Sequence, residues 1–152
     1  PVMEKACKFL NDMQVPFEVN ALSAHRTPTA VENFAKGAKD RGIKVIIAAA
    51  GMAAALPGVI AANTTLPVIG VPIKGMLDGL DAMLSIIQMP PGIPVATVGV
   101  NGAMNAAILA CEMIALGDPE MAKKMEVYKA GLGAKIEKAN KELAEVKYDY
   151  KC

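Results

Sequence analysis

The sequence predicts an α/β fold in three layers, with a parallel β-sheet between two layers of helices and a helical extension at the C-terminus. Amphipathic helical patterns alternate along the chain with short apolar runs, as they do when crossover helices join parallel strands. The runs, such as residues 45–50, are apolar along their whole length, which is typical of strands buried on both faces. Hydrophobic residues make up 53% of the 152 residues, enough for a sizeable core. We expect one domain over residues 1–152, with the sandwich in residues 1–117 and the extension in residues 118–152.

The first elements predicted are a helix, a strand and a second helix. Residues 1–13 have apolar side chains at helical spacing, and residues 17–22 form a short strand pattern. The loop Ser23–Pro28 follows. Thr27 is a suitable N-cap, and the proline after it suits the first helical position, so we expect a helix that ends at Gly42.

The middle of the chain continues the alternation of strands and helices. Strands are predicted at residues 45–50, 67–71 and 95–100. Helices are predicted from about residue 57 to Asn63, from Leu80 to Gln88 and from Ala103 to Ala115.

A final helical region begins at Asp118, which can cap it, with Pro119 at the first helical position. Gly131 and Gly133 predict a break in this region. Lysine and glutamate are mixed along it at helical spacing, which indicates a solvated helix face.

Four loops are predicted to leave the carboxyl ends of the strands, the edge at which such sheets bind ligands. They are Ser23–Pro28, Gly51–Gly58, Pro72–Gly79 and Asn101–Asn105. The loop Ser23–Pro28 carries the only histidine of the chain, His25, whose side chain titrates near neutral pH. Arg26 beside it has a planar guanidinium that fits phosphate or carboxylate. This loop is a candidate for proton transfer and anion binding; the alternative is a surface turn that only carries a helix cap.

Composition and motifs disfavour several other classes of protein. The net charge is +1 and no basic stripe occurs, so we expect no nucleic-acid partner. Three scattered cysteines and one histidine disfavour a disulfide framework and a metal site, and they favour a reducing, cytoplasmic location. Dinucleotide and P-loop motifs do not occur. The uncharged residues 45–62 are interrupted by Gly51 and Pro57-Gly58, so we expect no membrane span.

The run Ser23-Ala24-His25-Arg26-Thr27-Pro28 resembles the Ser-Ala-His-Arg-Thr-Pro motif of the 5-(carboxyamino)imidazole ribonucleotide mutases of purine biosynthesis. Further segments resemble the same family in the same order, and the likeness extends from Pro1 to about Gly117. These segments are Lys44–Gly58, Leu66–Pro72, Gly79–Asp81, Ser85–Pro90 and Asn105–Ala107.

The resemblance implies a flavodoxin-like, mutase-like domain, a symmetric octamer and no cofactor. It implies transfer of a carboxylate from the exocyclic nitrogen of a ribonucleotide to ring carbon 4, through carbon dioxide held in a closed pocket. His25 would then shuttle the proton from carbon 4 to the nitrogen. Other residues implied to contact the substrate are Ser23, Ala24, Arg26, Gly51, Met52, Ala53 and Pro72. The Gln88-Met89-Pro90 run either contacts substrate or packs at a helix end.

The chain departs from the family pattern in three places, one of which is the loop Lys74–Asp78, one residue shorter than is usual in the family. Ala55 stands where the family has a histidine, and the family's initial strand with its Gly-Ser-x-Ser-Asp loop is not seen. We expect the natural protein to carry that strand and loop before Pro1. Two alternative functions stay open: the sister carboxylase, which uses free carbon dioxide and aminoimidazole ribonucleotide, and a non-catalytic module that binds ribonucleotides or supports assembly.

A homo-oligomer is expected from the final helical region, which is longer than one small sandwich needs to cover its sheet. Its apolar side chains would then pack against a partner subunit. These are Met121, Met125, Tyr128 and Leu132.

Overall fold

The computed structural model describes residues 1–151 and divides the chain into two compact units, residues 1–114 and a second unit that begins at Ala115. The elements up to the second unit are α1 (Glu4–Asp12), α2 (Pro28–Gly37), β1 (Ile46–Ala50), α3 (Leu56–Ala62), β2 (Val68–Pro72), α4 (Leu80–Ile87), β3 (Ala96–Thr97) and α5 (Ala103–Ala115). The second unit contains the long helix α6 (Pro119–Glu145).

The sheet is parallel and has the order β1-β2-β3 in the described part of the chain. Ile47 of β1 pairs with Ile69 of β2, and Gly70 of β2 pairs with Thr97 of β3. The prediction of a parallel sheet from fully apolar runs is confirmed, since all of β2 is buried. The third strand is shorter than the predicted residues 95–100, because only Ala96 and Thr97 pair with β2 in register.

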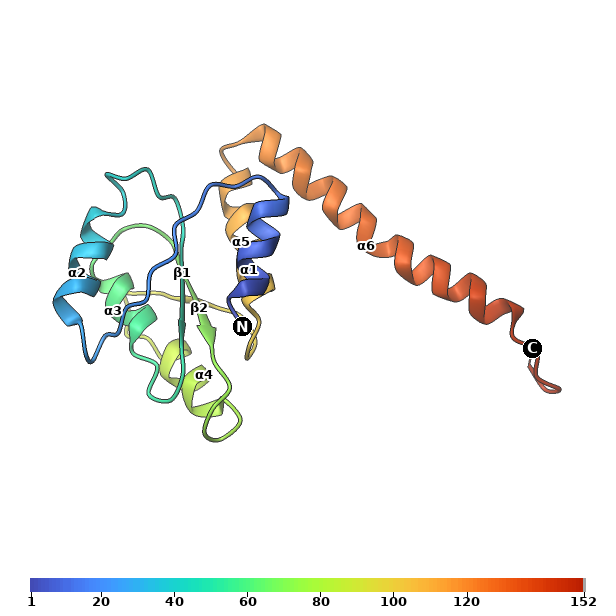
Figure 1. The fold of residues 1–152 in the computed structure, drawn as a ribbon, viewed down its shortest axis with the longest axis horizontal. Helices are drawn as coiled ribbons and strands as arrows, with labels where there is room; N and C mark the ends of the chain where they lie inside the picture. The colour runs from blue at the N-terminus through green and yellow to red at the C-terminus, as the bar shows by residue number, and fades with distance from the viewer. Residues whose placement is uncertain (152) are drawn as a thin grey trace. The chain divides into compact units, whose positions relative to one another are not determined.

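Helices cover both faces of the sheet, which confirms the predicted three-layer, flavodoxin-like α/β fold. Figure 1 shows α2 and α3 on one side of β1 and β2, and α1 and α5 on the other. Small residues bring helix and strand together: Ala35 of α2 is fully buried in one cluster with Ala48 of β1 and Ile60 of α3. At Gly70 of β2, a Cβ atom would collide with the Ile86 side chain of α4, so only glycine permits this close packing.

The predicted strand at residues 17–22 is wrong. These residues are extended, but they pair with no strand in the described part of the chain. Phe17 and Val19 are 44% and 70% exposed. A strand needs an adjacent strand that forms hydrogen bonds with its backbone N–H and C=O groups. The residue pattern of this segment does not indicate whether such a strand is present.

The predicted break at Gly131 and Gly133 is also wrong, because α6 continues from Pro119 to Glu145 without interruption. A glycine inside a helix costs only about 1 kcal/mol relative to alanine. Most of the residues around the two glycines are good helix formers, such as Ala130 and Ala134. The start of α6 is as expected, since the Asp118 side chain accepts hydrogen bonds from the N–H groups of Glu120 and Met121.

Two side chains expected to need a partner subunit are already buried within the chain. Met121 and Met125 are each 7% exposed, whereas Leu132 is 51% exposed. The sequence pattern predicted which positions of this helix are apolar. It did not predict which of these side chains are buried in the single chain. Among residues 1–151, no helix is both long and apolar enough to span a membrane.

Candidate functional site

The segment that carries His25 is a closed turn, built by the two residues on either side of its tip. The Ser23 N–H donates to Thr27 Oγ1 (3.0 Å), and Thr27 Oγ1 donates to the Ser23 carbonyl (3.1 Å). The Thr27 N–H donates to the same carbonyl at 2.8 Å. Ser23 Oγ accepts from the Arg26 N–H at 3.2 Å. The short polar side chains of serine and threonine therefore fix the backbone of the turn.

The hydroxyl groups of Ser23 and Thr27 both make local hydrogen bonds within the turn. Thr27 stands at the N-cap position of α2, but its hydroxyl bonds Ser23 rather than the first N–H groups of the helix. Ser23 Oγ bonds the Arg26 backbone and makes no hydrogen bond to His25. Pro28 takes the first turn of α2, as predicted. Serine and threonine thus shape the turn that presents the two residues between them.

His25 and Arg26 lie exposed at the tip of this turn, and Ala24 before them is half-buried. Within residues 1–151, neither the imidazole nor the guanidinium makes a hydrogen bond or ion pair. An imidazole and a cation that have no partner in the protein are available to a ligand. The turn can therefore supply a proton-transfer group and an anion-binding group side by side.

The loops after the strands of the sheet are tied together by backbone and by one asparagine. The Ile73 N–H donates to the Ala50 carbonyl at 2.9 Å, which joins the loop after β2 to the end of β1. The Asn101 N–H donates to the Pro72 carbonyl at 2.8 Å, and Asn101 Oδ1 accepts from the Lys74 N–H at 2.9 Å. The predicted meeting of these loops at the carboxyl edge is confirmed for the loops that follow β1, β2 and β3.

The turn at Ser23–Thr27 lies at the same end of the sheet in Figure 1, where the chain enters α2 near the carboxyl ends of β1 and β2. The two helices that start at this end, α2 and α3, pack against each other. Within the described residues, no hydrogen bond or ion pair joins the turn to the other loops. The fold therefore gathers the four segments at one end without fixing their side chains to one another.

The loop Gly51–Ala55 presents its backbone rather than polar side chains. Met52 is 60% exposed and has a φ of 54°, a left-handed conformation that is uncommon for a residue with a side chain. The N–H groups of Ala54 and Ala55 donate to the carbonyls of Met52 and Ala53. Those of Met52 and Ala53 donate no hydrogen bond within the described chain. These two amides are available to an anionic ligand.

Gly51 is half-buried, and a Cβ atom there would lie 3.5 Å from the Ile73 carbonyl oxygen, which is an ordinary contact. Nothing among the described residues therefore requires glycine at this position. Pro72 is fully buried at the end of β2, so its ring faces the interior and only the loop beyond it is accessible. In that loop, Gly79 has a φ of 89°, and a Cβ atom would lie 2.7 Å from a Val100 methyl group.

Met89 packs against α3, because a Cβ atom at Gly58 would lie 3.1 Å from its Sδ atom. The structure thus gives the Gln88-Met89-Pro90 run a packing role.

Ala55, which stands in place of the family histidine, is half-buried at the start of α3 and adds no polar group to the loop. No cluster of three or more potential metal ligands occurs in residues 1–151.

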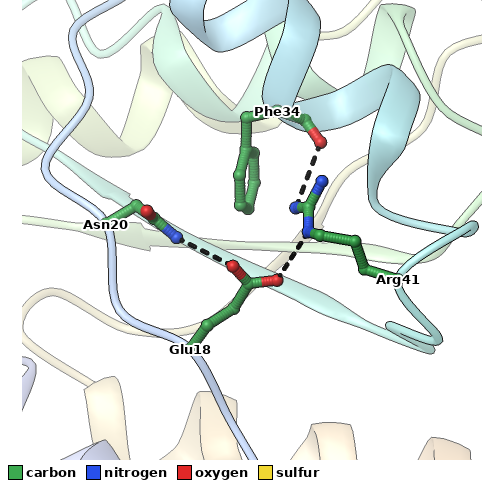
Figure 2. A network of polar contacts seen from close by, with 4 residues as sticks. All are labelled: Glu18, Asn20, Phe34 and Arg41. Atoms are coloured by element: carbon green, nitrogen blue, oxygen red, sulfur yellow. Dashed lines mark hydrogen bonds and ion pairs between the residues drawn. The ribbon is translucent and has the colours of Figure 1, made fainter.

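Sequence patterns did not indicate the polar network that joins Glu18, in the segment before the turn, to Phe34 of α2 and to Arg41 beyond that helix (Figure 2). Arg41 Nε donates to Glu18 Oε1 at 3.0 Å, and an Arg41 amino group donates to the Phe34 carbonyl at 3.4 Å. The Arg41 guanidinium also lies 5.1 Å from the centre of the Phe34 ring. The hydrogen bond from Arg41, with a smaller one from Asn20, lowers the pKa of the Glu18 carboxyl. Glu18 and Arg41 are 23 positions apart in the sequence, so no local motif could have indicated their contact.

Comparison with known proteins gives consistent matches. The family described as AIR carboxylase matches residues 1–135. The chain is 57% identical over 130 residues to N5-carboxyaminoimidazole ribonucleotide mutase of Pyrococcus abyssi, a match that covers 85% of this chain and 75% of the relative. It is 56% identical over 129 residues to phosphoribosylaminoimidazole carboxylase of Candida glabrata, covering 84% of this chain but only 23% of that longer protein. The crystal structure of Treponema denticola PurE superposes with a TM-score of 0.82 at 27% identity, covering 93% of this chain and 89% of that one.

Proposed function

This chain belongs to the AIR carboxylase family, and from that premise we propose that it is an N5-carboxyaminoimidazole ribonucleotide mutase of purine biosynthesis. The reaction moves the carboxylate of the substrate from its exocyclic nitrogen to ring carbon 4. The bond between nitrogen and carboxyl carbon breaks, carbon dioxide is released into the site, and carbon 4 attacks it. The proton displaced from carbon 4 ends on the nitrogen, so the reaction is an isomerisation that needs no other reactant.

His25 is the proton carrier in this proposal. One group must take the proton from carbon 4 and return it to the nitrogen, which requires a side chain that works as base and acid near neutral pH. The closed turn between Ser23 and Thr27 supports the assignment, because it holds the imidazole at an exposed tip with no competing partner in the described chain. This geometry, at the edge of a parallel sheet, is the observation that carries the proposal.

The anionic parts of the substrate have matching groups on either side of His25. The Arg26 guanidinium binds the ribose phosphate with two parallel hydrogen bonds, as arginine commonly does. The unused N–H groups of Met52 and Ala53 receive the carboxylate or the carbon dioxide. Ala24, Gly51 and, in the loop beyond Pro72, the exposed apolar side chains of Met76 and Leu77 provide walls that help to exclude water and retain carbon dioxide.

The second candidate is a carboxylase that takes aminoimidazole ribonucleotide and free carbon dioxide. The similarity to the Candida glabrata carboxylase favours it, together with the loss of a polar group at Ala55. A third, non-catalytic reading predicts nucleotide binding without turnover.

Formation of the ring carboxylate should be followed separately from each of the two substrates. We expect the protein to convert the N-carboxylated ribonucleotide and not to convert aminoimidazole ribonucleotide with free carbon dioxide. If only the second pair reacted, the protein would be a carboxylase and not a mutase.

We also propose that the protein is a homo-oligomer, an octamer as the family resemblance implies, and that it is cytoplasmic. The exposed apolar side chains of α6 support self-association, since Leu132, Ile136 and Leu143 are 51%, 65% and 62% exposed in the single chain. The free thiols of Cys7 and Cys111 suit a reducing compartment.

A further inference from the structure

The loop between β2 and α4 is closed on itself and extends beyond the carboxyl end of β2 (Figure 1). Its residues 74–78 are all exposed, and Leu77 and Asp78 have left-handed φ values of 46° and 55°. The Gly79 N–H donates to the Met76 carbonyl at 3.0 Å, within the loop. Contacts of this kind set the shape of the loop, but they do not set its position relative to the neighbouring loops.

Asn101, in the loop after β3, holds the start of this loop. Its N–H donates to the Pro72 carbonyl at 2.8 Å, and its Oδ1 accepts from the Lys74 N–H at 2.9 Å. In a parallel sheet, a strand residue uses its N–H and C=O groups to bond the two residues on either side of its partner in the same way. Asn101 therefore imitates a strand residue opposite Ile73, with its side-chain oxygen in place of a backbone carbonyl. Ile73 is held from the other side as well, because its N–H donates to the Ala50 carbonyl at 2.9 Å.

A second contact holds the far end of the loop. A Cβ atom at Gly79 would lie 2.7 Å from a Val100 methyl group and 3.2 Å from Lys74 Cα, so the two ends of the loop meet beside Val100. Apart from bonds to the adjoining start of α4, the bond from Lys74 to Asn101 is the only hydrogen bond in the described chain that joins residues 74–78 to another segment. Loss of the Asn101 oxygen would therefore leave the ends of the loop attached and loosen its exposed tip.

We infer that Asn101 is a positioning residue for Met76 and Leu77, at the tip of this loop, and thereby limits the escape of carbon dioxide from the site. The two side chains are apolar and 69% and 74% exposed, so they suit a wall that confines an uncharged gas. The inference rests on the proposed function, because a reaction that releases and recaptures carbon dioxide needs such a wall. Asn101 acts through the loop and not on the reacting atoms.

Escape of carbon dioxide has a consequence that can be measured. In the proposed reaction, carbon 4 captures the carboxyl group that was cleaved from the nitrogen, so the product keeps the substrate's own carbon. A displaced wall lets this carbon dioxide leave and lets dissolved carbon dioxide enter in its place. If unlabelled substrate reacts in isotopically labelled bicarbonate and carbon dioxide, the ring carboxylate then gains label. A general loss of stability lowers the amount of product but does not change its labelled fraction.

The test compares Asn101→Gly and Asn101→Asp with the matched control Asn63→Gly. Asn101 has a φ of 58°, which glycine adopts readily, so Asn101→Gly removes the bond to Lys74 and keeps the backbone conformation. Asn101→Asp retains an Oδ1 acceptor. The Asn63 side chain donates a hydrogen bond to the Val59 carbonyl at the end of α3, so the control makes the same substitution away from the loop.

We expect hydrogen exchange at Lys74 to become about tenfold faster in Asn101→Gly, as the loss of one hydrogen bond allows, and the labelled fraction of the product to rise severalfold. Asn101→Asp and Asn63→Gly should resemble the wild type in both measurements. Three results would overturn the inference: unchanged exchange in Asn101→Gly, faster exchange with an unchanged labelled fraction, or an Asn101→Asp protein as impaired as Asn101→Gly.

The exchange measurement also separates this inference from the function on which it rests, because it needs no substrate. A wild-type protein without mutase activity would refute the proposed function. The exchange data would still decide whether Asn101 holds the loop.

Discussion

At the scale of single residues, the ion pair between Glu18 and Arg41 makes a prediction about pH. Arg41 lowers the pKa of Glu18 in the folded protein, so folding favours the ionised carboxylate. The contribution of the pair is present above the pKa of an unfolded-state glutamate and is lost as the pH falls through the lower, folded-state pKa. A carboxylate titration followed by NMR should give a lower midpoint for Glu18 in the wild type than in Arg41→Gln. Equal midpoints would show that the pair does not form in solution.

Residues differ in how far the sequence could specify their roles. His25 is a candidate from sequence alone because it is the only histidine and lies between Ser23 and Thr27 in a segment predicted to precede a helix; its role stays a prediction. Arg41 was not found, because its partners Glu18 and Phe34 become neighbours only when the chain folds. The same holds for Asn101, whose side chain reaches a loop 27 residues earlier in the chain. Local chemistry can be read from the order of residues, whereas long-range polar contacts depend on the fold.

At the scale of elements, the exposed apolar face of α6 leads to a prediction about the proposed homo-oligomer. Leu132, Ile136 and Leu143 recur at helical spacing, so they share one face, and all of them are exposed. We expect light scattering to give the mass of an octamer for the wild type. The double variant Leu132→Lys with Ile136→Lys should dissociate into smaller species while its circular dichroism is unchanged, because two charges replace an apolar contact.

The control adds the same two charges to the opposite face of the helix, at Ala130→Lys with Ala134→Lys, and should leave the mass unchanged. Both alanines are exposed in the single chain. A folded wild-type protein with the mass of one chain would contradict the proposed assembly.

Elements with a complete apolar pattern were predicted well, and those that depend on a neighbour were not. The run 45–50 became β1 and the pattern 103–115 became α5, because burial on the sheet decides both. The segment 17–22 mixes apolar residues with Glu18 and Asn20 and has no partner strand among the described residues, so it is extended but unpaired there. The expected strand and phosphate-binding loop before Pro1 stay a prediction. The two glycines in α6 are tolerated because the cost of one glycine is small beside the sum over a 27-residue helix.

At the scale of the whole molecule, the candidate site consists of several segments that meet at one edge of the sheet, and not of a single motif. The hydrogen bonds of Asn101 and Ile73 join the loops after the strands, and the fold brings the His25 turn to the same end. In the proposed site, the proton carrier His25 and the cation Arg26 come from one turn, and the unused backbone amides of Met52 and Ala53 come from the loop after β1. The loops after the strands converge because parallel strands end at one edge, and the turn before α2 lies at the same end.

The central claim is that His25 carries the proton from ring carbon 4 to the exocyclic nitrogen. The most direct test is turnover of the N-carboxylated ribonucleotide by His25→Asn, with substrate binding and circular dichroism measured on the same sample. Asparagine is similar in shape and polar, but it cannot take up and return a proton at neutral pH. We predict an unchanged fold, retained binding and a kcat lowered by at least about 100-fold, as is typical when a general acid and base is removed. A His25→Asn protein with nearly wild-type kcat would contradict the account.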